Sequence, residues 1–501
     1  MPAPAAQLVP EMPPLAPPRP FVFPKVAKKI FDNGLTVFVA SDPDPAHAQP
    51  EVSIELLLPG AGTASDPPGK PGVAAMTASL VTEGTERRSA QEIANAIDFV
   101  GGSLSADASE DCTTIEATVV KKDFATAMDL LSDVTMHATF AAPELERRRE
   151  QTLSDLTMSY DDSEFLASAI FRREVFAGSA YGLPGEGTPA IVSALTRDDI
   201  VAFRNAHYFP KGALLAFAGA ITPEEAFAAT EKYLGEWKAQ SAASAPAGAN
   251  APAEIGAPRP KGLRIFLIDK PDAVQTQIRI GRPGIARNNP DYLALQVTNQ
   301  IFGGSYNARL NTAIRLKKGL TYDASSGFAS YRAGGDFEVT TFTRTEETAP
   351  ATQLVLDEYR KMSAGDVTPE ELGVAHDFLA GVFPLHAETP SQVADRVLGA
   401  AFYGLPADYL ETYQQRIRAV SADDVKRMAQ KYFDPQDLDL VFVGNIGGLR
   451  DAIAKVVPGA SIVEIRAQDV DLLSPTLRRP QFPSSAPANP PASGSGEAPH
   501  N

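Results

Sequence analysis

Cysteine, histidine and long apolar runs are all scarce in this sequence of 501 residues. Cys112 is the only cysteine, so no intrachain disulfide and no cysteine-based metal site can form. The chain has six histidines, and no two of them lie four residues apart, so none can share a helix face as paired ligands. No apolar run approaches the ~18 residues of a transmembrane helix, and we therefore expect no membrane span.

Positive charge is also in short supply. The chain carries 45 Lys and Arg against 62 Asp and Glu, a formal net charge of −17. A nucleic-acid-binding protein would need a basic face, so this class is disfavoured, whereas an acidic cavity that attracts cationic peptides stays possible. The apolar fraction of 44% and the charged fraction of 21% are ordinary for a soluble globular protein. The length predicts two or more domains.

Three segments have the composition of unfolded chain. They are an Ala/Pro-rich leader at 1–24, an Ala/Pro linker at 240–261 and a Pro/Ser tail at 472–501. The leader as written has neither the basic start nor the apolar centre of a signal peptide. The remaining residues predict an N-terminal domain at 25–239 and a C-terminal domain at 262–471.

The two predicted domains repeat each other. Three pairs of segments are separated by the same 225 residues, and chance matches rarely stay in register over such a length. We therefore predict a tandem duplication. The pairs are Thr196–Ile200 with Ser421–Val425, Pro210 with Pro435, and Phe217–Ile221 with Phe442–Ile446.

Each domain mixes strand-like runs with helix starts. The helices are indicated by capping boxes, in which Ser or Thr precedes Glu or Asp by three residues. Strands and helices do not alternate one for one, so we predict the α+β class: in each domain an antiparallel β-sheet with helices packed on one face. The capping boxes are Ser89/Glu92, Thr196/Asp199, Thr222/Glu225, Thr368/Glu371 and Ser421/Asp424.

Residues 303–322 contain the most informative motif. Arg315 precedes a helix end predicted near Gly319, and Tyr322 follows on the outgoing strand, so both can point at one place. A guanidinium and a phenol would supply donors to an extended peptide's carbonyl. The alternative is a surface charge at a helix C-terminus beside an ordinary strand aromatic.

The repeat argues against that alternative. When Ala96–Asp98 is aligned with Ala313–Arg315, Gly102 falls on Gly319 and Ser105 on Tyr322. The N-terminal copy therefore lacks the pair, which indicates that the fold alone does not require it.

Residues 303–322 and 72–85 together resemble the pitrilysin/insulinase-like zinc metallopeptidases, the inverzincin family that includes processing peptidases. The resemblance covers 26–471. It implies two homologous domains that form half of a clam-shell. It also implies that Arg315 and Tyr322 hold the bound peptide and face the developing oxyanion.

The family's zinc helix carries a His-x-x-Glu-His motif, and here only its flanks, Gly72–Ala74 and Gly84-Thr85, are kept. Ala75, Ala78 and Ser79 stand where the first His, the Glu and the second His would be, and Asp155 aligns with the distal ligand. One carboxylate without imidazoles cannot hold catalytic zinc. We therefore expect no cofactor in this chain and zinc in a partner.

The predicted function is the substrate-gripping, non-catalytic subunit of a heterodimeric zinc metallopeptidase. Its partner would be a zinc-bearing paralogous subunit, and the peptide substrate would bind as an added strand on a sheet edge. A structural or assembly protein without a peptidase role and a stand-alone peptide-binding homodimer are the alternatives. The resemblance favours a periplasmic or extracytoplasmic location, with the cytoplasm as the alternative.

Overall fold

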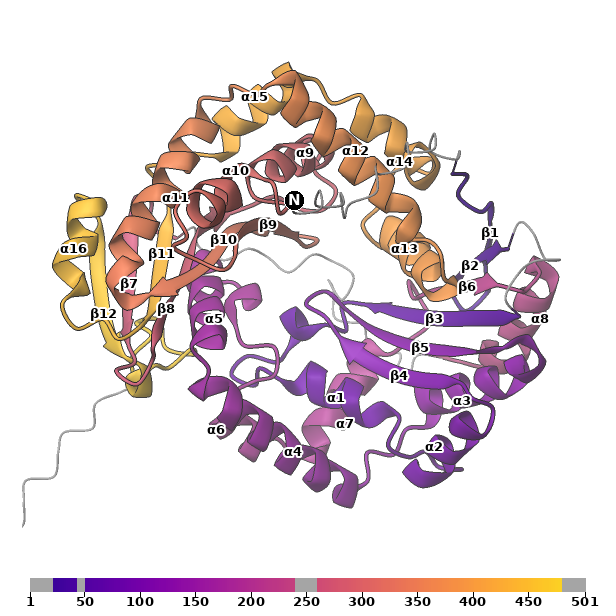
Figure 1. Ribbon diagram of the computed structural model, residues 1–501. Coiled ribbons are helices and arrows are strands. Elements are labelled where there is room, and N and C mark those ends of the chain that lie inside the picture. The colour runs from indigo at the N-terminus through magenta and orange to yellow at the C-terminus, as the bar shows by residue number, and fades with distance from the viewer. Residues whose placement is uncertain (1–20, 43–49, 239–258, 480–501) are drawn as a thin grey trace, which may run out of the picture.

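The computed structural model describes residues 21–42, 50–238 and 259–479, which form two α+β halves (Figure 1). Each half is built around a six-stranded sheet. In Figure 1 the halves form a curved shell, with the N-terminal half in indigo to magenta and the C-terminal half in rose to yellow. Within these residues, no helix is long and apolar enough to cross a membrane.

The N-terminal half contains six strands, eight helices and three 3₁₀ turns. They are β1 (Val26–Ile30), β2 (Thr36–Ser41), β3 (Glu51–Pro59), η1 (Thr63–Ser65), α1 (Val73–Val81), α2 (Ala90–Phe99), β4 (Ser103–Ala108), β5 (Cys112–Val120), η2 (Lys121–Asp123), α3 (Phe124–His137), α4 (Ala142–Asp161), α5 (Ser163–Val175), η3 (Ala180–Gly182), α6 (Pro189–Ala194), α7 (Arg197–His207), β6 (Leu214–Gly219) and α8 (Pro223–Leu234).

The C-terminal half has a similar order of elements. They are β7 (Arg264–Asp269), β8 (Gln275–Pro283), α9 (Tyr292–Phe302), α10 (Arg309–Asn311), the π-helical turn η4 (Thr312–Leu316), β9 (Ala324–Ser330), β10 (Gly335–Arg344), η5 (Thr345–Glu347), α11 (Thr348–Ser363), α12 (Pro369–Leu385), α13 (Pro390–Phe402), α14 (Tyr409–Arg418), α15 (Ala422–Tyr432), β11 (Asp439–Gly444), α16 (Leu449–Val456), β12 (Ser461–Arg466) and η6 (Ala467–Asp469).

The two α+β domains are confirmed, but the sheets are mixed rather than wholly antiparallel as predicted. The strand orders are β1-β2-β6-β3-β5-β4 and β12-β7-β11-β8-β10-β9. β2 pairs with β6, and β7 with both β11 and β12, in parallel. The long segment between β2 and β6, which includes α1 to α7, supplies the crossover that a parallel pair needs.

The predicted duplication is confirmed by matching elements. α7 and α15 begin at the equivalent capping boxes of Thr196 and Ser421, and both boxes are complete. β6 and β11 are the third strand in their sheets. The two sheets differ at one edge. The edge strand is β1, from the start of the N-terminal half, in the first sheet and β12, from the end of the C-terminal half, in the second.

Each sheet is covered on both faces, which corrects the prediction of helices on one face. The second face of each sheet contacts a helix from the other half: α5 packs on β8 and β11, and α13 packs on β3 and β6. β3 is buried without alternation from Val52 to Leu58, and all six residues of β11 are buried. Such uninterrupted burial is typical of strands covered on both faces. The exchanged helices therefore join the two halves.

The folded region also extends beyond the predicted domain boundaries. Phe23, in the predicted leader, is 3% exposed, and Leu472 and Leu477, in the predicted tail, are 2% and 1% exposed. Arg259, in the predicted linker, forms ion pairs with Asp437 and Asp439. These residues contribute to the fold because their side chains pack against it. Residues 1–20 of the leader, 240–258 of the linker and 480–501 of the tail lie outside the described residues.

Three carboxylates meet where α13 packs on the N-terminal sheet. Glu55 on β3 lies opposite Glu116 on β5, and Asp395 on α13 shares a hydrogen bond with Glu55. The Ser391 hydroxyl donates to Glu116 at 2.7 Å. Burial, followed by repulsion from Asp395 and Glu116, raises the pKa of Glu55 from 4.5 to about 9. Glu55 therefore holds the proton in this interface.

Stability is expected to fall as the pH rises from 4.5 toward 9, and Glu55→Gln is expected to weaken this dependence. The raised pKa means that the folded state binds the Glu55 proton more tightly than the unfolded state. Its stabilising contribution is thus complete below pH 4.5 and lost on the way to pH 9, by up to about 1.4 kcal/mol per pH unit.

Chemical denaturation of wild type and Glu55→Gln between pH 5 and pH 9 measures this difference. Glu51→Gln, on the same strand, is the control. Parallel pH profiles for wild type and Glu55→Gln would contradict the prediction.

Candidate functional site

The start of α1 is held by a buried carboxylate and a glycine. Asp66 accepts hydrogen bonds from the backbone N–H groups of Gly72 and Ala74, both at 2.7 Å. Burial raises the pKa of Asp66 to about 7, and the two backbone hydrogen bonds oppose the shift. Gly72 has φ +98°, and a Cβ there would lie 2.9 Å from the carbonyl oxygen of Glu186. The backbone geometry at this end of α1 therefore needs glycine and brings Glu186 beside the helix.

The residues after α1 form a separate ion-pair cluster. The Thr85 hydroxyl donates to Asp133 at 2.9 Å, and Asp133 also pairs with Arg87 at 2.9 Å and Arg88 at 2.5 Å. The Asp133 side chain is 1% exposed. Thr85 thus has a structural role that needs no metal ion.

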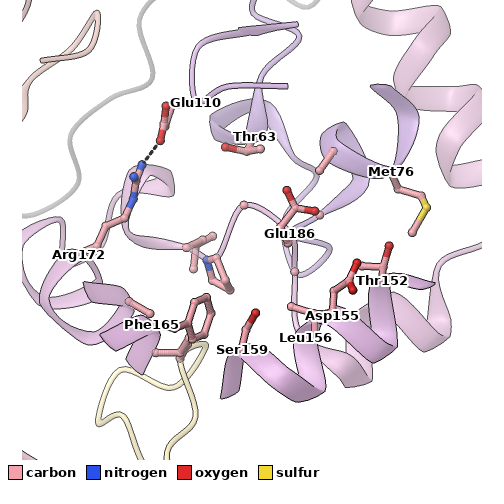
Figure 2. Close-up of a pocket in the computed structure, with 18 of the residues that line it drawn as sticks. Thr63, Met76, Glu110, Thr152, Asp155, Leu156, Ser159, Phe165, Arg172 and Glu186 are labelled. Carbon is pink, nitrogen blue, oxygen red and sulfur yellow. Dashed lines mark ion pairs between the residues drawn. The ribbon is translucent and has the colours of Figure 1, made fainter. Parts of the chain in front are cut away.

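A cavity of about 520 Å³ lies beside α1, as Figure 2 shows. Ala75, Ser79 and Asp155 line it, so the structure brings these three predicted positions together. Ala78 is 1% exposed and packs on the buried side of the helix instead. Glu186 also lines the cavity and was missed by sequence reasoning, because it lies in a loop between η3 and α6 that has no periodic pattern.

The residues around this cavity do not fit a catalytic zinc ion. A zinc site needs imidazole or thiolate ligands in tetrahedral geometry. Ala75 offers a methyl group and Ser79 a hydroxyl that donates to the Met76 carbonyl at 3.0 Å. In the part of the chain that the structure describes, no three His, Cys, Asp or Glu side chains are grouped to hold a metal ion. Asp155 and Glu186 are the carboxylates at this cavity that could take part in binding a metal ion.

Arg315 lies on a π-helical turn in the C-terminal half. Lys317 donates its backbone N–H to the Thr312 carbonyl at 3.0 Å, one residue farther than in an α-helix. Leu310 and Ile314 are fully buried. Gly319 has φ +63° and donates to the Arg315 carbonyl at 2.9 Å, which forms a left-handed C-cap. π-helical turns such as η4 are frequent at functional sites.

The π-helical turn also corrects the alignment of the two repeats. Gly101, with φ +65°, caps α2 in the N-terminal half, whereas the sequence placed Gly102 opposite Gly319. The π turn accommodates one additional residue, which shifts the equivalent glycine by one position.

The Arg315 guanidinium lies between two tyrosine rings. Its central carbon is 4.4 Å from the ring centre of Tyr322 and 4.9 Å from that of Tyr306. Tyr322 is 72% and Tyr306 57% exposed. Among the described residues, Arg315 has no hydrogen bond or ion pair. Stacking orients the guanidinium and leaves its N–H edge available for a ligand.

Hydrogen bonds fix the backbone on both sides of Arg315. The Thr343 and Thr341 hydroxyls on β10 donate to the carbonyls of Leu320, at 2.5 Å, and Asp323, at 2.7 Å. The buried Asn311 side chain donates to the Tyr306 carbonyl at 2.7 Å. The loop that carries Tyr322 and the loop that carries Tyr306 are therefore both anchored. Tyr306 was missed by sequence reasoning, since aromatic residues in Gly/Ser loops give no clear signal.

The Arg315 site and the cavity beside α1 are separate. Of the described residues that line the cavity, none comes from 303–322. In Figure 1, α10 and β9 lie in the C-terminal half and α1 lies in the N-terminal half. The structure therefore does not place Arg315 and Tyr322 against this chain's own Ala75, Ser79 and Asp155.

Two family models match the chain. The model described as insulinase (peptidase family M16) matches residues 39–182, and the peptidase M16 inactive domain matches 194–377. An uncharacterized zinc protease of Streptomyces coelicolor is 26% identical over 370 residues, which cover 74% of this chain and 80% of that protein. A probable mitochondrial-processing peptidase subunit beta of Arabidopsis thaliana is 24% identical over 438 residues, or 85% of this chain and 80% of that protein.

Solved structures show the same fold. A peptidase M16 inactive domain from Pseudomonas fluorescens has a TM-score of 0.75 at 24% identity, covering 83% of this chain and 97% of its own. A protease from Helicobacter pylori has a TM-score of 0.77 at 20% identity, covering 84% and 100%.

Proposed function

Because this chain belongs to the insulinase-like peptidase M16 family, we propose that it is the substrate-gripping subunit of a heterodimeric zinc metallopeptidase. The complex would degrade or process peptides, and a paralogous subunit would bring the zinc. One observation carries the proposal: Arg315 is stacked between two exposed tyrosines without a partner in the described chain, whereas α1 presents no metal ligand.

In this proposal the chain's own residues bind and orient the peptide. The Arg315 N–H groups and the Tyr322 hydroxyl donate to a peptide carbonyl. Their interaction strengthens as that carbonyl becomes an oxyanion, which lowers the barrier to cleavage. Because this pair does not contact the cavity beside α1, the reacting carbonyl would be presented to the metal of the partner subunit.

Two findings from the comparisons support a subunit role. One domain model is described as inactive, and one relative is named as a subunit of a processing peptidase. A structural protein and a peptide-binding homodimer remain the alternatives. Affinity purification from the native host, followed by mass spectrometry, tests the proposal: a zinc-bearing family member at equal stoichiometry is expected. Peptidase activity should then appear only when the two separately purified chains are mixed.

The purified chain is expected to bind no stoichiometric zinc and to cleave no peptide alone. The reason is the donor set around Ala75, Ser79 and Asp155, which lacks imidazoles. Elemental analysis measures the metal content. The triple variant Ala75→His, Ala78→Glu, Ser79→His is the matched comparison; it should take up more zinc but remain a poor peptidase, since Asp155 is shorter than Glu. One equivalent of zinc and chelator-sensitive cleavage by the unmodified chain would disprove the expectation.

A further inference from the structure

The C-terminal half contains a second cavity, of about 230 Å³, that the proposed function does not use. It lies between α9, α12, α13 and α14, and α14 contacts both α9 and α13 (Figure 1). The duplication relates this cavity to the one beside α1, because α9, α12 and α13 follow in the same order as α1, α4 and α5. The repeated fold therefore leaves an open space at the corresponding place in each half.

Arg287, in the loop between β8 and α9, is the first of two arginines that line this second cavity. Its central guanidinium carbon lies 3.9 Å from the ring centre of Tyr292 and 5.3 Å from that of Tyr409. One N–H group donates to the Tyr409 hydroxyl at 3.0 Å. Within the described residues Arg287 forms no ion pair, although the chain has 62 acidic and 45 basic residues. The rings thus orient a guanidinium whose charge no carboxylate of this part of the chain neutralises.

Arg396, on α13, is the second arginine of the cavity. Its Nε donates to the His386 carbonyl at 3.4 Å, and it too has no ion pair in the part of the chain that the structure describes. Of the described residues that line the cavity, Asp395 is the only carboxylate, and it shares a hydrogen bond with Glu55 of the N-terminal half. One carboxylate offsets at most one guanidinium, so the cavity keeps an excess of positive charge.

Tyrosine hydroxyls add further donors to the cavity wall, which includes Tyr403, Tyr409 and Tyr413. Burial raises the pKa of each phenol above its usual value, and Arg287 opposes the increase without cancelling it. The hydroxyls therefore stay protonated at neutral pH and can donate hydrogen bonds. Guanidinium and phenol groups that converge on one cavity suit an anion, and the planar fork of a guanidinium matches a carboxylate.

We propose that this second cavity binds a carboxylate of the peptide substrate, from an acidic side chain or from the C-terminus. The inference rests on the proposed function, because the ligand is the peptide that Arg315 holds. Arg287 and Arg396 donate to the carboxylate oxygens. The volume is below the ~300–1,000 Å³ of typical small-molecule sites, so the cavity suits one peptide residue rather than a cofactor. The cavity thus selects peptides by negative charge.

Four forms of one fluorescent peptide, added to the purified full chain, test the carboxylate site. The peptide repeats alanine and serine, so it can shift its register until a carboxylate reaches the cavity. One pair contains a single glutamate or glutamine and ends in an amide, whereas the other pair lacks that residue and ends in a free carboxylate or an amide. Fluorescence anisotropy should show that at least one carboxylate form binds about tenfold or more tightly than its neutral counterpart. The pair that shows the difference identifies the source of the carboxylate.

Variants of the cavity wall assign the preference to this site. Arg287→Gln and Arg396→Gln should each reduce it, and the double variant should remove it. Gly399→Leu should also remove it without a change of charge, because Gly399 lines the cavity and a Cβ there would meet no remote atom within 4 Å. Arg418→Gln, which alters an exposed arginine on α14 that pairs with Asp377, is the control and should keep the preference.

Three results would overturn the carboxylate site: equal affinity of wild type for charged and neutral forms, no measurable binding of either carboxylate form, or a preference that survives in the double variant. Arg315→Ala should weaken all four peptides by the same factor. If Arg315→Ala instead binds every form as tightly as wild type and keeps the preference, the proposed grip fails and the carboxylate site stands.

Discussion

Arg315→Ala is expected to lower the turnover of the reconstituted complex by about a hundred- to a thousandfold, which corresponds to about 2.7–4 kcal/mol of transition-state stabilisation. The lost donors act on the peptide carbonyl as it becomes an oxyanion. The effect should therefore appear mainly in kcat, with a smaller rise in KM from weaker peptide binding. Tyr322→Phe removes one donor and should give a reduction in the same direction.

Arg315→Ala should leave the fold almost unchanged. Arg315 is half-buried and pairs with no carboxylate in the described chain, so truncation leaves no buried charge without its partner. Surface changes of this kind usually alter the free energy of unfolding by less than about 0.5 kcal/mol. A kinetic loss with an unchanged melting temperature would separate a direct role from a structural one.

Lys318→Ala is the matched control for Arg315→Ala. Lys318 lies three residues farther along the chain, just after the π-helical turn, is exposed, and has no ion pair among the residues of the structure. Steady-state cleavage of one fluorogenic peptide by complexes carrying each variant gives the comparison. If both variants turn over at the wild-type rate, Arg315 does not hold the substrate, and the structural alternative gains support.

Asp439→Ala is expected to lower the free energy of unfolding by about 3–5 kcal/mol. Asp439, at the start of β11, is 0% exposed and lies 2.7 Å from Arg264 and 3.2 Å from Arg259. Arg264 also pairs at 2.8 Å with Glu174 on α5, so the network joins the two halves. Removing the central carboxylate leaves guanidiniums buried without adequate compensation, which is costly in a low-dielectric environment.

The control is an ion pair of the same length on the surface. Arg418 and Asp377 lie 2.7 Å apart, with side chains that are 47% and 76% exposed. Asp377→Ala should change stability by no more than about 1 kcal/mol, because solvent screens exposed pairs. Urea denaturation of both variants compares the two effects. Equal losses would show that burial does not set the strength of the Asp439 network.

Local features were predictable wherever neighbouring residues determine the structure. The capping boxes of Ser89, Thr196 and Ser421 all form, because a side chain three residues away satisfies the free N–H groups of the helix end. The left-handed turn at Gly319 follows equally from the residue itself. The spacing of Arg315 and Tyr322 across that turn was sufficient to predict that they meet.

Contacts between residues far apart in the sequence determined the parts of the fold that local sequence patterns did not reveal. Both sheets are covered on their second face by α5 and α13, each contributed by the other half. β3 is buried on both faces although Ser53 and Glu55 alternate with apolar residues, so its sequence does not identify the helix that covers its second face. Glu186 and Tyr306 were missed for a related reason, since loops that join a site through the tertiary fold have no periodic pattern.

By itself, the sequence determined the duplication, the α+β class and the absence of imidazoles at Ala75 and Ser79, because residue identity and spacing alone carry these properties. Only the tertiary structure decided that α5 and α13 are exchanged and that Glu186 joins Asp155 in one cavity. It also showed that Arg315 stands between two tyrosines, apart from that cavity. These arrangements depend on which apolar surfaces, far apart in the sequence, become buried against each other. Such contacts form only when the whole chain has packed.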